Sequence, residues 1–347
     1  MVEDPTERLE RATRAFTTKR VPSGSLVQLV EGEAPPRPGD LVLARVDAVR
    51  NHVRVHLPEG GRKNLFEGDE LILVYGDRYA PRQFEARVPT HLGPCHLVAA
   101  GGVAAEVISS HARIHKGPTT LTPIGLVANS AGFRVNLADW ALPAGRDFEC
   151  HRPATIAVCG TSMDSGKTTL AAHLTRGLVR AGQRVGYAKV TGTGAGGDPW
   201  LLRDAGASPV VDLVDAGVAS TYRLDVEHLE WILGCLWSHL RDSEVDAVIL
   251  EVADGLLQTE TASLLRTPLF SKLSDGILFA CADSMGALAG VEWLRARGLA
   301  VLGIGGTIGR SPLQLREAVD ATGALAFRRR DLADPATALK IFHSFHR

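Results

Sequence analysis

The feature that most constrains the fold is the stretch Gly160–Thr169, which reads Gly-Thr-Ser-Met-Asp-Ser-Gly-Lys-Thr-Thr. It follows an apolar run at Ala154–Cys159 that is typical of a buried strand, and it precedes a segment whose apolar spacing predicts a helix. Strand, glycine-containing loop, Gly-Lys-Thr and helix is the order that a phosphate-binding loop requires. In such a loop, backbone N–H groups and the positive end of the helix dipole face the phosphates. The stretch therefore predicts a nucleotide site.

The residues of this loop have separate expected roles. Lys167 would neutralise the β- and γ-phosphates, and the hydroxyl of Thr168 would bind Mg²⁺. Thr161 stands where the simplest pattern has its first glycine, since Gly160 lies one residue earlier. The other residues expected to contact the nucleotide are Thr161, Asp164, Ser165, Gly166 and Thr169.

From residue 152 onward, apolar runs alternate with amphipathic segments. The runs are continuously apolar, as in a sheet that is covered on both faces. This pattern predicts a doubly wound, mostly parallel α/β domain whose ligand lies at the carboxyl ends of the strands. The expected strands are Ala154–Cys159, Arg184–Val190, Ala247–Val252, Gly276–Ala282 and Leu299–Gly303. The expected helices are Thr168–Ala181, Val226–Arg241, Thr259–Leu265, Met285–Arg297 and Pro312–Thr322.

Residues 21–147 follow another pattern, in which short alternating runs are separated by turns. Such strands predict a small barrel or sandwich, and the composition of Thr6–Thr17 predicts a leading helix. We therefore expect two domains, a β-rich domain at residues 1–150 and the phosphate-loop domain at residues 151–347. The polar and aromatic segment at residues 75–85 fits a binding loop and a plain hairpin tip equally well.

Composition excludes several classes of function. The chain has 347 residues with 38 basic and 39 acidic side chains, so no basic footprint for nucleic acid is expected. It has no apolar run of about 20 residues that would span a membrane, and its start lacks a secretory signal, which predicts a cytoplasmic protein. Five dispersed cysteines predict no disulfide, and no metal cage is expected from the histidines.

Three further residues follow apolar strands or lie beyond a strand end on the side of the phosphate loop. Lys189 leaves the second strand, where it could hold a transferring phosphate or an anionic substrate. Glu251 ends the third strand and Asp204 follows the lysine loop, so both are candidate Mg²⁺ ligands beside Thr168. The alternatives are a surface salt bridge for Lys189, a helix cap for Glu251 and a turn for Asp204.

Together these segments resemble dethiobiotin synthetase. Its phosphate loop reads Gly-Thr-Asp-Thr-Glu-Val-Gly-Lys-Thr, and its Gly-Tyr-Lys-Pro-Val segment is similar to Gly186–Val190 here. The loop of cobyric acid synthase-type amidoligases is similar too. The resemblance covers residues 153–325 and implies that Lys167 and Lys189 are catalytic, with Thr168, Asp204 and Glu251 on Mg²⁺. The proline after Lys189 is absent, and a Val-Ala-Asp-Gly sequence follows Glu251, which implies a different substrate.

The function expected from this resemblance is ATP- and Mg²⁺-dependent activation of a small anionic substrate, as in a kinase or ligase. The competing function is a nucleotide-dependent switch or scaffold whose β-rich domain binds a protein partner. The glycine-rich stretch Thr191–Asp198 fits an ordering switch as well as a substrate clamp. A homodimer is compatible with either function.

Overall fold

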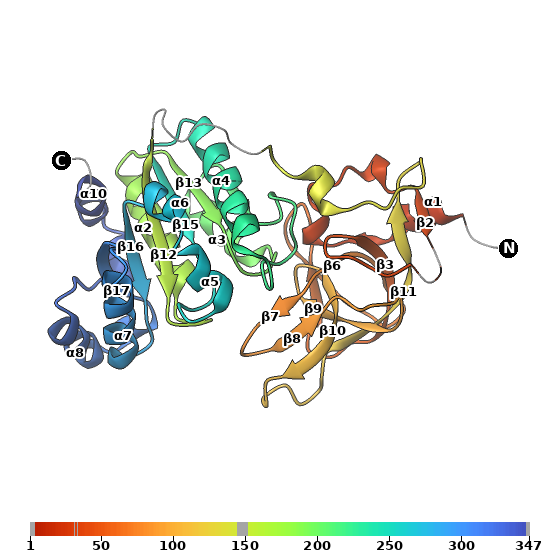
Figure 1. Ribbon diagram of the computed structural model, residues 1–347, viewed down its shortest axis with the longest axis horizontal. Coiled ribbons are helices and arrows are strands. Elements are labelled where there is room, and N and C mark those ends of the chain that lie inside the picture. Colours follow the sequence, from red (N-terminus) through yellow and green to blue (C-terminus); the bar gives the residue numbers. More distant parts are fainter. Residues whose placement is uncertain (1–3, 31, 33, 144–151, 345–347) are drawn as a thin grey trace. The chain divides into compact units, whose positions relative to one another are not determined.

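The computed structural model describes residues 4–30, 32, 34–143 and 152–344 (Figure 1). The expected domain boundary near residue 150, Cys150 and the first three residues therefore lie outside the described residues. The chain forms two compact units. Unit 1 contains Met1–Leu142, Thr193–Gly197 and Leu213–Arg223, and unit 2 contains the rest.

Unit 2 is built on a six-stranded parallel sheet with the strand order β14-β13-β15-β12-β16-β17. Four of the strands, β12, β13, β15 and β16, are buried at every position, as expected for a sheet with two covered faces. β12 lies between β15 and β16, and β13 is the next strand beyond β15. The bounds are β12 Ala154–Gly160, β13 Val185–Lys189, β14 Val210–Asp212, β15 Ala247–Glu251, β16 Gly276–Ala280 and β17 Val301–Gly305.

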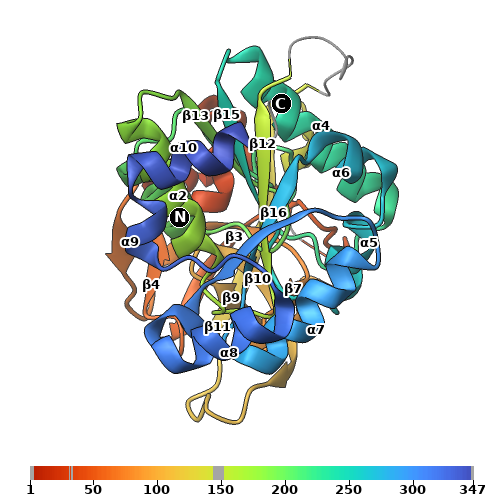
Figure 2. The same ribbon diagram turned by 90° about the vertical axis from the view of Figure 1, so that its left-hand side faces the viewer.

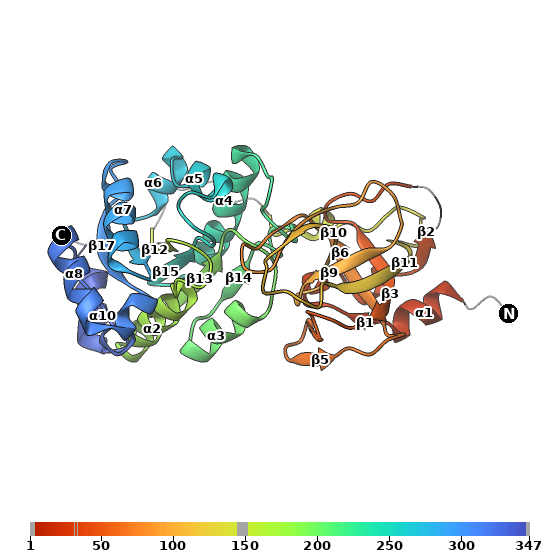
Figure 3. The ribbon, with the colours of Figure 1, turned by 90° about the horizontal axis from the view of Figure 1, so that it is seen from below.

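Helices cover both faces of this sheet. α2, α9 and α10 lie together on one face, while α4, α5, α6 and α7 lie on the other (Figures 2 and 3). The α/β prediction with a parallel sheet is confirmed. The bounds of the helices are α2 Lys167–Arg180, α3 Gly197–Ala205, α4 Val226–Asp242, α5 Thr259–Leu264, α6 Pro268–Leu273, α7 Ser284–Arg295, α8 Pro312–Thr322, α9 Arg329–Leu332 and α10 Pro335–His343, with a 3₁₀ turn, η4, at Thr307–Arg310.

Unit 1 contains a nine-stranded sheet in which five strands pair in a closed ring. β6 pairs with β3, β3 with β11, β11 with β9, β9 with β10, and β10 returns to β6 in parallel. The strand bounds are β1 Thr13–Arg14, β2 Gln28–Val30, β3 Leu41–Ala48, β6 Glu70–Tyr75, β7 Arg78–Tyr79, β8 Phe84–Arg87, β9 Cys95–Ala99, β10 Val103–Ser110 and β11 Thr119–Ala128, and β4 Arg54–His56 pairs separately with β5 Arg62–Asn64.

Alternate residues of the ring strands enter two different hydrophobic clusters. Leu41 and Leu43 of β3 belong to one cluster, and Val42 and Ala44 belong to the other. Both faces of β3 are therefore buried, because successive side chains of a strand point to opposite faces. One cluster also contains Val214 and Ala219, which come from the distant segment Leu213–Arg223.

The leading helix is shorter than expected. α1 spans Pro5–Arg11 and begins at Asp4, whose carboxylate accepts from the N–H of Thr6. Residues 13–14 then pair with β6 as β1, and the 3₁₀ turn η1 spans Phe16–Thr18. In the described part of the chain, every helix falls short of the length and apolarity that crossing a membrane requires.

Candidate phosphate-binding site

The loop between β12 and α2 is held by close backbone packing. Gly160 has no room for a side chain, since a Cβ there would lie 2.5 Å from Ser165 Oγ and 2.6 Å from the Ala280 carbonyl oxygen. Gly166 precedes α2 with φ +101°, a left-handed conformation that favours glycine. The N–H of Thr307 donates to the Ser165 carbonyl over 2.9 Å, which ties the loop to η4. The start of α2 borders a cavity that Gly166, Lys167 and Thr168 help to line, where an anion could bind.

Lys167, the first residue of α2, lies along the loop. Its Nζ donates to the carbonyl oxygens of Ser162, at 2.8 Å, and Asp254, at 2.9 Å. The residue is 6% exposed, and burial lowers the pKa of its ammonium group, against the opposing effects of Glu251 and Asp254. The ammonium group is thus positioned within the loop by two backbone oxygens, which a phosphate could replace as partners.

Thr168 faces two carboxylates. Its hydroxyl donates to Oε1 of Glu251 over 2.8 Å and lies 3.4 Å from Oδ1 of Asp198. The second carboxylate oxygen of Glu251 accepts from the Tyr187 hydroxyl at 2.8 Å. Glu251 ends β15, which lies directly beside β12, so strand pairing brings it to the phosphate loop. This sheet order, the loop and the carboxylate at the neighbouring strand end decide the class.

Unit 2 has a P-loop-type fold.

The buried position of Glu251 shifts the pKa of its carboxyl. This residue is 2% exposed, and burial raises the pKa of its carboxyl, with Asp198 adding to the effect and Lys189 opposing it. A hydroxyl and two carboxylates supply only oxygen donors, which is the donor chemistry that Mg²⁺ prefers. The described residues contain no group of three or more His, Cys, Asp or Glu side chains able to hold a metal by themselves. Mg²⁺ needs no such cage, because it usually binds through one or two carboxylates together with phosphate and water.

Lys189 ends β13 opposite Glu251, and its partner is Asp198. Nζ lies 2.5 Å from Oδ2 of Asp198, and the lysine is 8% exposed. Burial acts to lower the pKa of Lys189, yet Asp198 and Glu251 together hold it above its ordinary value. Lys189 therefore has a carboxylate partner within unit 2, and its expected catalytic role stays a prediction.

Asp204, the other predicted Mg²⁺ ligand, is placed differently from Asp198. It lies in the last turn of α3 and is exposed, six residues beyond Asp198 and so about 9 Å further along the helix axis. Asp198, in the first turn, is the residue that faces Thr168. The signal that could have found it is its position directly after a glycine-rich run, where an acidic residue typically begins a helix.

Some of the residues predicted to contact the nucleotide line a cavity, and others do not. Asp164, Gly166, Lys167, Thr168 and Thr169 line a cavity of about 260 Å³ together with Thr307 and Arg310, and we call this the phosphate cavity. Ser165 is 1% exposed, and the N–H of Thr161 donates to the Ala280 carbonyl over 2.9 Å. Neither of these two residues is among those that line the cavity.

Comparisons with known proteins give a limited likeness. No family model matches the chain, and no curated protein is similar enough to match. Among solved structures, the signal recognition particle receptor FtsY from Elizabethkingia anophelis in complex with GDP has 15% identity and a TM-score of 0.39, over 61% of this chain and 69% of that one. The 54 kDa signal recognition particle protein from Aeropyrum pernix, also with GDP, has 20% identity and a TM-score of 0.37, over 57% and 50%.

The cell division protein FtsY from Thermotoga maritima has 16% identity and a TM-score of 0.31, over 59% of this chain and 60% of that one. The comparisons overturn two expectations. The prediction of a small-molecule kinase or ligase like dethiobiotin synthetase is wrong, and so is the prediction of a small anionic substrate as partner.

Proposed function

We propose that the P-loop NTPase domain binds a nucleoside triphosphate with Mg²⁺, hydrolyses it, and acts as a switch whose state is read by unit 1, which binds a protein partner. The observation that carries this proposal is the position of Asp198. Its carboxylate faces Thr168, and the five residues before it, Thr193–Gly197, belong to unit 1. A nucleotide-dependent change at Asp198 would therefore reach unit 1 through the covalent chain.

The residues around Thr168 support the metal part of the proposal. Thr168, Glu251 and Asp198 are the oxygen donors that would hold Mg²⁺, and the ion would neutralise charge on the β- and γ-phosphates. Lys167 would exchange its two carbonyl partners for phosphate oxygens. The neutralised phosphates would then face the start of α2, where the helix dipole favours negative charge.

The segment before Asp198 supports the switch part. Within unit 1, the N–H of Gly196 donates to Nδ1 of His56 over 3.0 Å, and the N–H of Gly194 donates to the Ala219 carbonyl over 2.9 Å. Gly192, just before the segment, has φ +106°. A short stretch fixed in one unit and followed directly by a metal-facing carboxylate resembles the segments that order around a γ-phosphate and relax after hydrolysis.

The predicted domains at residues 1–150 and 151–347 remain a proposal.

The test measures backbone protection in three nucleotide states. Hydrogen exchange of the full chain would be followed without nucleotide, with a diphosphate, and with a non-hydrolysable triphosphate, each with Mg²⁺ and in guanine and adenine series. We expect the loop 160–168 to be protected by both nucleotides, and Thr193–Gly197 to differ between the diphosphate and triphosphate states.

A matched pair of variants controls the test. Asp198→Asn should abolish the difference at Thr193–Gly197, whereas Asp204→Asn, on the exposed far end of the same helix, should keep it. Protection confined to the loop 160–168 in every state would contradict the switch. Absence of binding in both nucleotide series would contradict the whole proposal.

A further inference from the structure

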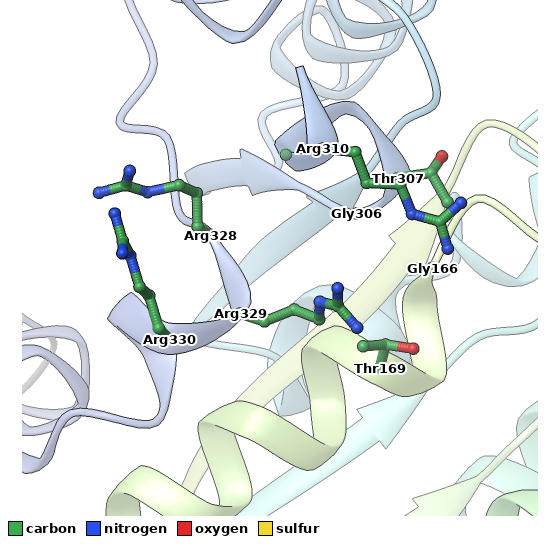
Figure 4. A pocket seen from close by; sticks show the side chains of 9 residues that line it. Gly166, Thr169, Gly306, Thr307, Arg310, Arg328, Arg329 and Arg330 are labelled. Carbon is green, nitrogen blue, oxygen red and sulfur yellow. The ribbon is translucent and has the colours of Figure 1, made fainter. Parts of the chain in front are cut away.

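A second cavity lies beside the phosphate cavity in unit 2. Its volume is about 280 Å³, and we call it the arginine cavity (Figure 4). It shares Gly166, Thr169, Thr307 and Arg310 with the phosphate cavity. A nucleotide whose terminal phosphates lie at the start of α2 must continue away from the loop, and the shared lining makes the arginine cavity the adjoining space for its ribose.

The lining of this cavity is strongly cationic. Besides the shared residues it consists of Gly306, Gly309 and three consecutive arginines, Arg328, Arg329 and Arg330. No carboxylate is among the described residues that line it. The concentration of positive charge in this lining favours an anion inside the cavity.

Two of the four arginines are already paired. Arg328 Nε lies 3.1 Å from Oδ2 of Asp331, and Arg330 Nε lies 3.9 Å from the other oxygen of that carboxylate. The side chains of Arg310 and Arg329, by contrast, make no hydrogen bond or ion pair with any residue in the described part of the chain. In Figure 4 their side chains extend toward the side of Thr169 and the start of α2, whereas Arg328 and Arg330 extend the opposite way.

A base and an unmodified ribose do not call for this charge. Both are neutral, and nucleotide-type pockets usually meet them with apolar walls and a few polar groups. Planar guanidinium groups are instead suited to bidentate recognition of phosphate. The 5′-phosphates are already provided for by Lys167, by the start of α2 and by Arg310, which also lines the phosphate cavity. Arg329 lines only the arginine cavity, so its unpaired guanidinium group exceeds what an ordinary nucleotide needs.

We propose that the arginine cavity binds a phosphate carried on the ribose of the nucleotide whose 5′-phosphates occupy the phosphate cavity. The ligand class is a nucleoside 5′-diphosphate that carries a further phosphate or diphosphate on its ribose, and the 3′-phosphorylated members of this class serve as probes. This inference rests on the proposed nucleotide binding and narrows it. Two sources share this chemistry, the 3′-phosphoadenosine diphosphate group of coenzyme A-type cofactors and guanosine 3′,5′-bis(diphosphate).

The experiment compares matched ligands by titration calorimetry on the full chain with Mg²⁺. Adenosine 3′-phosphate 5′-diphosphate is paired with ADP, and guanosine 3′,5′-bis(diphosphate) is paired with GDP, so each arm isolates the ribose phosphate. We expect at least one 3′-phosphorylated ligand to bind about tenfold to a hundredfold more tightly than its partner, the gain typical of charged hydrogen bonds. The arm that shows the gain identifies the source, and added salt should reduce it.

Two variants test whether the arginine cavity causes the higher affinity for the 3′-phosphorylated ligands. Arg329→Gln should remove the preference and should weaken the binding of ADP and GDP much less, because Arg329 lines the arginine cavity but not the phosphate cavity. Arg316→Gln, on an exposed position of α8 outside both linings, should change neither affinity.

The outcomes separate the two proposals. Equal binding within both ligand pairs, or a preference that survives Arg329→Gln, would overturn the inference and leave the nucleotide switch standing. Failure of all four ligands to bind would overturn the proposed function and this inference with it.

Discussion

Nζ of Lys189 and Oδ2 of Asp198 lie 2.5 Å apart, and this ion pair joins the end of β13 to the first turn of α3. Lys189 is the more buried partner, with 10% of its side chain exposed against 33% for Asp198. Burial acts to raise the pKa of Asp198, but Lys189 holds it below its ordinary value. Lys189 thus favours the charged form of the carboxylate that faces Thr168, which the proposed metal role requires.

The first prediction concerns nucleotide affinity. Lys167→Ala should weaken binding of a nucleoside triphosphate by about tenfold to a hundredfold, because it removes a charged donor at the start of α2. Titration calorimetry would measure the loss, with the exposed Lys340→Ala as control. An unchanged affinity in Lys167→Ala would show that the loop does not hold the phosphates.

A second prediction tests which carboxylate serves the metal. Asp198→Asn should raise the Mg²⁺ concentration needed for half-maximal nucleotide binding by about tenfold to a hundredfold, as is usual when a metal-supporting group is lost. Asp204→Asn should leave it unchanged, since Asp204 is exposed at the other end of α3. Equal Mg²⁺ requirements in the two variants would show that Asp198 does not bind the metal ion.

The third prediction is a pH dependence set by Glu251. Its pKa is raised above the ordinary 4.5, chiefly by burial and then by Asp198, so the folded protein favours the neutral carboxyl. The stabilising contribution of this group is fully present below pH 4.5 and is lost as the pH rises through the raised folded-state pKa.

Glu251→Gln should therefore increase the stability of the protein at neutral pH in the absence of nucleotide and Mg²⁺, and the gain should shrink as the pH falls toward 4.5. Thermal unfolding across this range would measure it. The exposed Glu292→Gln is the control and should show no such trend. A gain of the same size at every pH would mean that relief of a buried charge is not its cause.

A fourth prediction concerns packing at the phosphate loop. Gly160→Ala should destabilise the protein by about 1–3 kcal/mol, the usual cost of forcing extra atoms into a close-packed site. The added Cβ would meet Ser165 Oγ and the backbone oxygen of Ala280, and that oxygen cannot rotate away. Chemical denaturation would measure the loss. Gly24→Ala, where a Cβ would meet nothing within 4 Å, should change stability little.

Much of unit 2 could be predicted because its signals are local. Fully apolar strands such as Ala154–Gly160 and long amphipathic helices such as Val226–Asp242 are recognisable within a short window, and each was predicted to within a few residues. Glu251 could be placed beside the phosphate loop because parallel strands end at the same edge of a sheet. The short strand Val210–Asp212 and the helix Gly197–Ala205 were missed, since glycine and a brief apolar run give little local signal.

The pairing of Lys189 with Asp198 could not be predicted in the same way. Choosing Asp198 rather than Asp204 requires knowing where α3 begins, and helix starts are the least certain part of a sequence-based prediction. The segment Leu213–Arg223 belongs to unit 1, where it packs with residues that are far away in the sequence. Nothing in that segment distinguishes a surface loop from a part of another hydrophobic core.

The contribution of Val214 and Ala219 to the core of unit 1 has a consequence for how this protein can be divided. Both residues are almost completely buried there, with 1% and 3% exposure, yet they lie more than 70 residues beyond Leu142 in the chain. A fragment cut after residue 142 would lose them and expose part of its interior. The two units are therefore poor candidates for modular exchange by recombination. A gene fusion that kept only the β-rich half would encode an incomplete fold, and a natural shortened form of that kind should be degraded rather than function alone.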